Sequence, residues 1–389
     1  MSAVEPPSEV ATRAGFAAVA RRQVVVLSPT IHFRLRPGDR ALVAPGDTVV
    51  PGLPIAERTP DARLVHVGRL AGPSRNSSHG ADGEASPVEP TPAGNASSPA
   101  SLEGDGRRPP LPGEWWAGGG ERRRMWPRGK PTAPVGGTLL FESGGRWLAA
   151  AAARHQIVES PVAGIVREAR NAVEVTIEAT GAALTGALAA GEPSRGHLDV
   201  PRLADGELWA SALDVGRSGA VVVAGSRISA QAISRARAVS IHGLVAGSVG
   251  QGDLRDFEAS EMRQSASLVE TIPFGLIALD GNARRPIPTP ILTLLAALVG
   301  REVAIVTNPP LLVFDAAAVP LPDLPSDWIR VRSGQHAGRE GRWLEPGGLR
   351  RFRSGIYLEA AVVRLGGDTE PTVVPVSDLE RFTFQVQVP

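Results

Sequence analysis

Four short apolar runs decide the fold of this chain: AVVVA at 220–224, GLVA at 243–246, FGLIAL at 274–279 and VAIV at 303–306. Each run has the length of a buried strand and is followed by turn residues. A strand that is apolar at every position, rather than at every second one, is typical of a sheet covered on both faces. The runs therefore predict buried strands at the centre of an α/β domain.

Helical sequence separates these strands. A helix expected over 229–238 starts at a serine, which is a good N-cap residue, and a second is expected over 253–267. A third, over 289–300, starts with Thr-Pro and ends at a glycine, and its leucines and isoleucine recur at helical spacing. Strands that alternate with helices predict βαβ units and a parallel sheet. We expect a small Rossmann-like α/β domain over residues 205–318.

The segments before this domain read as short strands with tight turns. Residues 1–20 are expected to be an N-terminal tail. After them, residues 21–70 and 136–204 contain runs such as QVVVL at 23–27 and predict one β domain in two pieces. Between the pieces, residues 71–135 are rich in Pro, Gly and Ser and hold almost no Leu, Val, Ile or Phe. Such a segment cannot bury enough apolar surface to offset its ordering entropy, so we predict a disordered insert.

The insert contains aromatic residues beside arginines, namely Trp115, Trp116, Arg122 and Trp126. In a disordered segment this combination is typical of a short motif that binds a protein partner. A solubilising insert with incidental tryptophans would look the same. Both interpretations stay open.

The composition excludes several kinds of chemistry. The chain has no cysteine, which removes disulfides, thiolate zinc sites and iron–sulfur clusters, and its 41 basic residues include a single lysine, Lys130. The net charge is +1, so any basic surface must be local. Residues 1–15 lack the apolar core of a secretory signal, and the longest apolar helix candidate, 291–299, is too short to span a membrane. A cytoplasmic location without a membrane span is expected.

Two short motifs suggest the fold of the first β domain. APGDTVVPGLPIA at 44–56 resembles one half of the barrel-sandwich hybrid, the fold of biotinyl and lipoyl carriers, and SPVAGIV at 160–166 resembles its partner half. The resemblance implies a split hybrid barrel. A carrier presents a modified lysine on a hairpin between the halves, whereas Lys130 lies in the insert and precedes a proline. The module therefore resembles the structural hybrids of RnfC-type electron-transfer subunits, and neither biotin nor lipoate is expected.

The C-terminal region carries a second resemblance. IRVRSGQHAGREGRW at 329–343 resembles a KOW motif, in which glycines allow tight turns between strands. The resemblance implies a KOW/SH3-like β-barrel over 327–389, after a Pro-rich linker at 319–326. KOW modules occur in NusG-like transcription factors and ribosomal proteins, so RNA, RNA polymerase or the ribosome are the partners that it implies. The connection 344–355 is longer than a minimal KOW turn.

Charge is concentrated in the same region, where seven arginines between 330 and 353 face two glutamates. Arginine forks suit phosphate groups. The predicted RNA- or partner-binding residues are Arg330, Arg332, Arg339, Arg342, Arg350, Arg351 and Arg353. A solvated charged face in an arginine-rich chain is the alternative.

Turns that follow the strands of the α/β domain form a second candidate site. GSVGQG at 247–252 places Gly-x-x-Gly-x-Gly between a strand and a helix, where backbone N–H groups could cradle an anion. The candidate anion or ligand residues are Ser226, Ser248, Gly250, Gly252, Asp280 and Asn282. Tight-turn glycines and a helix-capping or turn aspartate are the alternative.

No catalytic constellation is readable. The sequence has no His-Glu-x-x-His array and no Gly-x-Ser-x-Gly elbow, so no catalytic residue, metal or cofactor is predicted. The expected function is that of a non-enzymatic multi-domain binding or scaffold protein whose KOW-like barrel docks on RNA or on transcription or translation machinery. Two alternatives stay open: a small-molecule-binding or enzymatic α/β domain with β modules as scaffold, and a docking subunit that joins a larger complex through the hybrid barrel.

Overall fold

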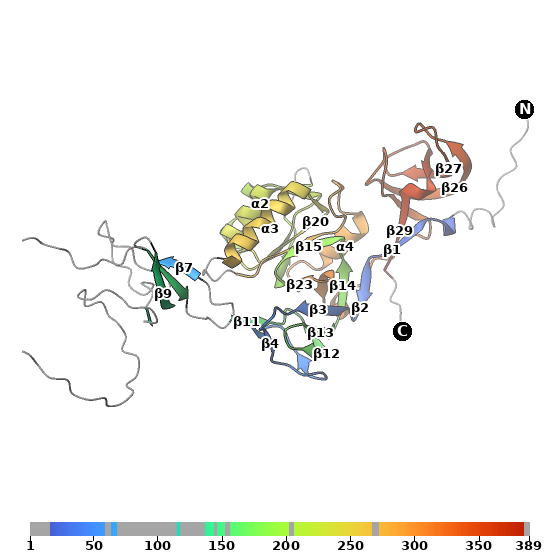
Figure 1. The fold of residues 1–389 in the computed structure, drawn as a ribbon. Helices are drawn as coiled ribbons and strands as arrows, with labels where there is room; N and C mark the ends of the chain where they lie inside the picture. The colour runs from blue at the N-terminus through green and yellow to red at the C-terminus, as the bar shows by residue number, and fades with distance from the viewer. Residues whose placement is uncertain are drawn as a thin grey trace, which may run out of the picture. The chain divides into compact units, whose positions relative to one another are not determined.

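The computed structural model of the chain describes residues 16–58, 64–67, 115–116, 137–143, 146–151, 156–201, 206–266 and 272–384 (Figure 1). The protein is β-rich, as predicted, and its sheets fall into two compact units. One unit comprises residues 1–56 and 158–389, and the other comprises residues 57–157.

The largest sheet belongs to the first unit and has nine strands. In spatial order they are β15 (Leu188–Gly191), β22 (Gly275–Ala278), β20 (Gly243–Ala246), β18 (Val221–Val223), β16 (Ser194–Asp199), β23 (Glu302–Thr307), β24 (Pro310–Phe314), β14 (Ala182–Thr185) and β2 (Val25–Leu27). β16, β18, β20 and β22 are parallel. The first three apolar runs form β18, β20 and β22, which confirms this part of the prediction.

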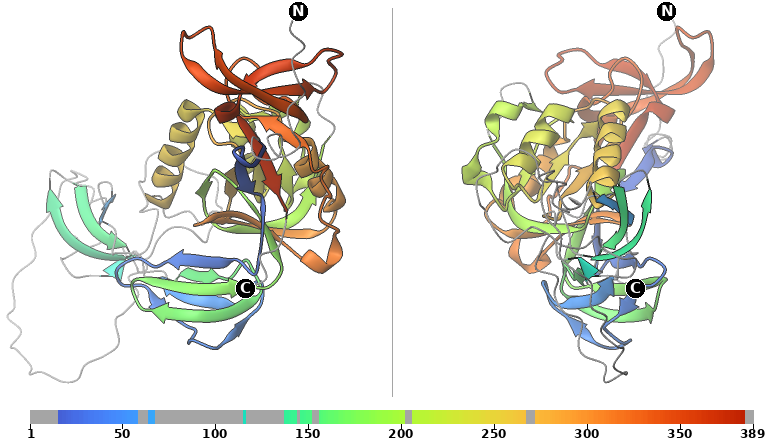
Figure 2. Two further views of the ribbon diagram at one scale, coloured as in Figure 1. Left: turned by 90° about the vertical axis from the view of Figure 1, so that its right-hand side faces the viewer. Right: turned by 60° about the vertical axis from the view of Figure 1, so that its left-hand side comes forward.

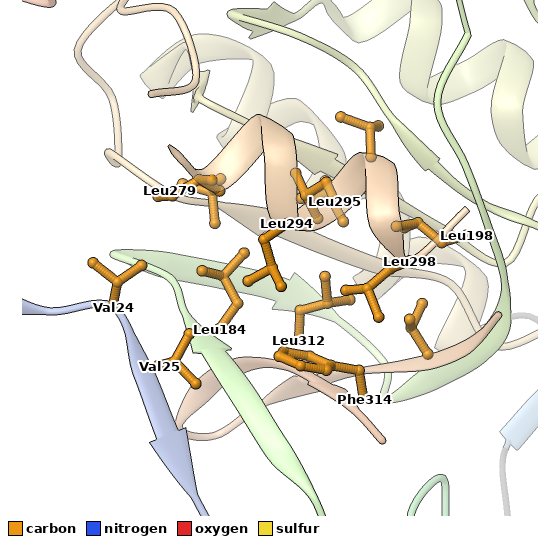
Figure 3. Packing of buried hydrophobic residues seen from close by; sticks show 14 of the residues in the cluster. Val24, Val25, Leu184, Leu198, Leu279, Leu294, Leu295, Leu298, Leu312 and Phe314 are labelled. Atoms are coloured by element: carbon orange, nitrogen blue, oxygen red, sulfur yellow. The ribbon is translucent and has the colours of Figure 1, made fainter. Parts of the chain in front are cut away.

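Helices cover both faces of these strands. Successive side chains of a strand point to opposite sides, so neighbouring residues of one strand pack against different helices. On one face, Val222, Leu244 and Leu276 pack with α2 (Ala230–Ala238) and α3 (Gln251–Ala266). On the other face, the neighbouring residues Val221, Val245 and Ile277 pack with α4 (Thr289–Ala297). Figure 3 shows the leucines of α4 among side chains of β14 and β24 in this second core.

The fourth apolar run forms β23, but in the opposite direction. β23 pairs antiparallel with both β16 and β24. Uniform apolarity indicates that both faces of a strand are buried, and it carries no information on strand direction. The expectation of a wholly parallel sheet is therefore wrong for β23, and the sheet is mixed.

The far end of the nine-stranded sheet shares a further core with two smaller sheets. One runs in the order β3 (Thr30–Arg34), β13 (Glu174–Ala179), β12 (Gly164–Arg170) and β5 (Thr48–Val49), the other in the order β11 (Gln156–Glu159), β6 (Pro54–Arg58) and β4 (Arg40–Ala41). The two separated pieces of the predicted β domain meet here, since Gly164 pairs with Val49. β14, β15 and β16, which lie within the predicted range 136–204, belong instead to the nine-stranded sheet.

The described residues of the second unit include a sheet in the order β7 (Leu64–Val67), β10 (Arg146–Ala151), β9 (Gly137–Ser143) and β8 (Trp115–Trp116). Trp115 and Trp116 thus form a short strand, paired with Thr138 and Gly137. Arg122, Trp126, Lys130 and the rest of the insert predicted over 71–135 lie outside the described residues.

The C-terminal sheet has six strands in the order β1 (Ala20–Gln23), β29 (Leu379–Thr383), β25 (Trp328–Val331), β26 (Glu340–Arg351), β27 (Tyr357–Leu365) and β28 (Thr372–Pro375). Its core includes Val19, Ile329 and Trp343. β29 pairs with β25 on one side and with the N-terminal strand β1 on the other, so neither edge of β29 is left to close onto β28. The sheet is therefore open among the described strands, where a closed KOW-like barrel was expected.

The C-terminal sheet packs directly on the α/β domain. Phe382 and Phe384 belong to the core beneath α4, and Trp328 is partly buried against it. Val319, in the segment expected to be a linker over 319–326, is buried in the same core. The predicted linker is thus a packed part of the first unit.

Short elements complete the first unit. A small parallel sheet comprises β17 (Glu207–Leu208), β19 (Arg227–Ile228) and β21 (Ser248–Val249), and the 3-10 helices are η1 (Ala210–Ala212), η2 (Val215–Arg217), η3 (Ala316–Ala318) and η4 (Val376–Asp378).

Candidate nucleic-acid interface and the closed edge of the parallel sheet

A buried ion network joins the α/β domain to the C-terminal sheet. Arg330 of β25 is 0% exposed, and its Nη1 and Nη2 donate to Oδ1 and Oδ2 of Asp280 over 3.1 and 2.6 Å. Nη1 also donates to Oε1 of Glu380 over 3.1 Å. Arg22 of β1 donates from its Nη1 to Asp280 over 2.7 Å. One carboxylate thus receives two guanidinium groups, from the first and the last parts of the chain.

The pKa of Asp280 reflects two opposing effects. Burial alone would raise it, but the hydrogen bonds and charge of Arg330, together with those of Arg22, outweigh burial and hold the pKa below its ordinary value. Burial likewise acts to lower the pKa of Arg330, and Asp280 and Glu380 raise it above its ordinary value. Both partners are therefore charged at neutral pH.

This network closes the edge of the sheet at which a ligand was expected. Asp280 directly follows β22, at the carboxyl ends of the parallel strands, where open α/β sheets usually bind their ligands. Its side chain is 1% exposed and is fully engaged by arginines. The structure thus assigns Asp280 to the attachment of the C-terminal sheet. It also removes Arg330 from the predicted RNA-binding set, because a fully buried guanidinium group cannot reach a phosphate.

The predicted Gly-x-x-Gly-x-Gly turn is packed against its neighbours. A Cβ on Gly247 would lie 2.5 Å from the carbonyl oxygen of Arg285. A Cβ on Gly250 would lie 2.5 Å from Oδ2 of Asp253, whose Oδ1 accepts from the N–H of Ala230 over 3.1 Å. Close approach of other atoms accounts for these glycines, and a carboxylate occupies the region where an anion was expected.

The other members of the predicted ligand set have separate roles or positions. Ser248 is buried and donates from its hydroxyl to the carbonyl oxygen of Ser226 over 2.8 Å. Gly252 and Asn282 are exposed. The described geometry is that of tight turns held to one another, which is the alternative interpretation of these residues.

A different arrangement stands out at the end of the C-terminal hairpin. β26 and β27 pair along their length, with two bulges in β26, and can be followed in red in Figure 2. At the end of the hairpin, the N–H of Phe352 donates to the carbonyl oxygen of Ile356 over 3.0 Å, and that of Gly355 to Phe352 over 2.8 Å. Gly355 has φ +81°, the left-handed conformation that such short hairpin loops require. The long connection noted at 344–355 is thus an extended hairpin arm and its turn.

We call residues 349–357 the arginine tip. Arg350, Arg351 and Arg353 are exposed, and none has an ion-pair partner among the described residues. Large apolar side chains accompany them, with exposed fractions of 64% for Leu349, 58% for Ile356 and 61% for Tyr357. Unpaired positive charge and exposed apolar surface therefore occur on the same short segment.

The remaining predicted arginines do not extend this surface. Arg339 is paired with Asp368 over 2.7 Å, and Arg342 lies 3.7 Å from Asp327. Arg332 is exposed and lies just after β25. Because of the two bulges, the stretch of β26 from Arg342 to Arg351 pairs with only the residues from Arg364 to Tyr357, a span of roughly 23 Å at the usual rise of a strand. The seven arginines are thus spread over the sheet, and three of them form the tip.

Sequence reasoning missed the apolar half of the tip and half of the ion network. Tyr357 is the single tyrosine of the chain and follows the arginines closely, so it could have been noticed. Arg22 and Glu380 carried no local signal. Arg22 lies 258 residues before its partner Asp280, and Glu380 lies 50 residues after its partner Arg330, so each pair meets only in the fold.

A groove of about 710 Å³ lies between α2 and α3. Arg237 on its wall is paired with Glu261 over 2.6 Å and lies over the rings of Phe257 and Phe274. The guanidinium group of Arg237 is thus already engaged. No cluster of three metal-ligating side chains occurs in the part of the chain that the structure describes, and no helix there has the length and apolarity needed to cross a membrane.

The chain matches no family model and no curated protein. The geometry of its own residues is therefore what supports a function.

Proposed function

We propose that this chain is a non-enzymatic binding protein that contacts RNA through the arginine tip. The observation that carries the proposal is the set of three exposed guanidinium groups, on Arg350, Arg351 and Arg353, without ion-pair partners among the described residues. The net charge of the chain is only +1, so these three arginines form a local excess of positive charge that a negatively charged partner would balance.

The chemistry of these groups suits phosphate. A guanidinium group is planar, stays charged at any physiological pH and donates to two phosphate oxygens at once. Phosphate contacts supply much of the affinity of RNA-binding proteins and make it dependent on salt. A short hairpin end can also approach an irregular RNA surface with charges on both sides of the ribbon.

Finer aspects of the proposal come from the resemblances. A KOW-like module would explain the glycine turns after β25, and it suggests an RNA-containing transcription or translation assembly as the partner. A split hybrid barrel in the first β domain would act as a scaffold without a carrier lysine. The open pairing of the C-terminal sheet means that any such KOW-like module is an elaborated one.

A small-molecule function is the second candidate, and the groove between α2 and α3 is the observation that favours it. The carboxyl edge of the parallel sheet is closed by Arg22 and Arg330, so this groove is the better candidate for a ligand of the α/β domain. Thermal stabilisation of the full chain by a metabolite, lost in Arg237→Ala, would support it. The third candidate, docking through the first β domain, rests on no specific contact.

Fluorescence polarisation of a labelled RNA with the full chain tests the main proposal. The variant carries Arg350→Gln, Arg351→Gln and Arg353→Gln. The control carries Arg332→Gln, Arg342→Gln and Arg364→Gln, which removes the same charge from exposed positions elsewhere on the sheet. Three lost phosphate contacts should flatten the slope of log affinity against log salt by about two, at about 0.7 per contact on a single strand.

The control variant should keep most of the wild-type slope. Equal losses in the two variants would show that net charge alone drives binding, and absence of RNA binding by the wild type would overturn the proposal.

A further inference from the structure

We infer that the arginine tip selects unpaired RNA bases, with the ring of Tyr357 as the stacking surface and the arginines as phosphate anchors. This inference rests on the proposed RNA-binding function and specifies the form of RNA that is bound. It is carried by the position of Tyr357 in the hairpin.

The register of the hairpin places an aromatic ring and a charge side by side. Tyr357 is the direct partner of Arg351, and Leu349 is the partner of Glu359. Directly opposed residues of an antiparallel pair share a face, and so do residues two apart on one strand. Tyr357, Arg351, Leu349 and Glu359 therefore share one face of the ribbon, while Arg350 belongs to the other. A base stacked on the tyrosine would have the guanidinium group of Arg351 beside it on the same face.

The side chain of Tyr357 takes no part in the core of the C-terminal sheet. The ring is 61% exposed and lies outside the apolar cluster around Ile329 and Trp343. The turn that presents it is fixed by two backbone hydrogen bonds and by the left-handed Gly355. Aromatic side chains with few rotatable bonds lose little entropy when they bind, so a ring presented in this way is suited to recognition.

The face of a base is accessible only where the base is unpaired. In an A-form duplex the bases are stacked on one another, and the major groove is too deep and narrow for side chains to read. Arginines can contact the phosphates of a duplex as well as those of a single strand, whereas an aromatic side chain stacks on splayed bases. The tyrosine should thus add affinity for single strands alone.

The single tyrosine of the chain allows a direct test. Full-length protein grown with 3-fluorotyrosine carries its label at Tyr357 only, so one ¹⁹F resonance reports on the tip. We expect this resonance to shift on addition of an oligouridine of about 12 nucleotides, within the range of single-strand site sizes, and to stay in place on addition of an RNA duplex of the same length.

Affinity measurements with variants complete the test. Tyr357→Ala should weaken oligouridine binding about tenfold, a typical effect of one lost stacking contact, and leave duplex binding unchanged. Tyr357→Phe should bind like the wild type, because the ring is kept. Trp209→Ala, which removes an aromatic side chain that is 57% exposed outside the tip, is the matched control and should have no effect.

The outcomes separate the two proposals. If the wild type binds both RNAs and Tyr357→Ala weakens both equally or neither, the stacking inference fails and the RNA-binding function stands. If neither RNA binds and the resonance does not move, both fail, and a protein partner for the tip becomes the better explanation of its exposed residues.

Discussion

Arg330 and Arg332 are two positions apart, and the sequence gives no reason to separate them. Their environments are opposite, because Arg330 lies within β25 and is buried, whereas Arg332 follows the strand and is exposed. The difference comes from Asp280 and Glu380, which are both 50 residues from Arg330 in sequence. Counting arginines predicts a basic region and leaves open which of them reach the surface.

Replacing Arg330 by Met should therefore be costly. The change leaves the carboxylates of Asp280 and Glu380 in the interior without their shared partner, and breaking a buried ion pair in this way typically costs about 3–5 kcal/mol. Arg332→Met is the matched control and should change the free energy of unfolding by less than about 0.5 kcal/mol. Urea unfolding of the two variants measures both values, and similar small losses would show that the network contributes little.

The lowered pKa of Asp280 predicts a pH dependence of stability. A carboxyl whose folded pKa lies below its unfolded value contributes stability that is present above about pH 4 and is lost as pH falls through the folded pKa. Asp280→Asn lacks this contribution at every pH. The difference in unfolding free energy between wild type and Asp280→Asn should be large at pH 7 and shrink as pH falls below about 4.

Urea unfolding at several pH values measures this difference. Asp327→Asn, at a carboxylate that is 38% exposed and 3.7 Å from Arg342, is the control and should show a small difference throughout. A difference for Asp280→Asn that grows on acidification would contradict the assignment.

At the scale of elements, the sequence predicts best where local pattern and tertiary burial agree. The apolar runs and capping residues located β18, β20, β22 and the three helices α2, α3 and α4 to within a few residues. Strand direction was not predictable in the same way, since β23 is as apolar as its parallel neighbours and runs against them.

Strand pairing between segments that are distant in sequence was also not predictable. β1 lies parallel to β29, and Ala20 and Glu380 are partners in that register although they are at opposite ends of the chain. The residues up to 20 read as a tail, because a short strand has no meaning until its partner strand is known. A barrel was expected here, and the described strands form an open sheet in which β1 pairs with β29. The candidate site was recovered in part: the arginines of the tip were named, and its aromatic residue was not.

At the scale of the whole molecule, the predicted modules of the first unit share hydrophobic cores and are not separate domains joined by linkers. One face of the nine-stranded sheet contributes to the core under α4, and Phe382 and Phe384 join that core from the C-terminal end of the chain. The other face packs with α2 and α3 at one end of the sheet and with the first β domain at the other end. A fragment that contained only the C-terminal sheet would expose these rings and Arg330. RNA binding therefore has to be measured on the full chain.

The second unit, in contrast, is inserted at a single point of the first. β6 leads out to it and β11 leads back, and the two strands are neighbours in one sheet. Gly52 donates to the carbonyl oxygen of Ser160 over 2.8 Å, and Ser160 donates to that of Leu53 over 2.9 Å, so the strands are held together before the insertion begins. Such an arrangement is that of a hairpin whose turn has been replaced by a long segment.

We predict that replacing residues 59–155 by a short Asn-Gly-containing turn leaves the first unit folded and its RNA affinity unchanged. Closing a shorter loop costs less entropy, by about 0.6 kcal/mol for each halving, so the unfolding free energy should stay the same or rise by no more than about 2–3 kcal/mol. Hydrogen exchange of the amides in β18, β20 and β22 would show whether the nine-stranded sheet is intact. Loss of their protection would mean that the inserted unit is required for folding, whereas loss of RNA affinity with protection retained would place the RNA contact in the insert and not at the arginine tip.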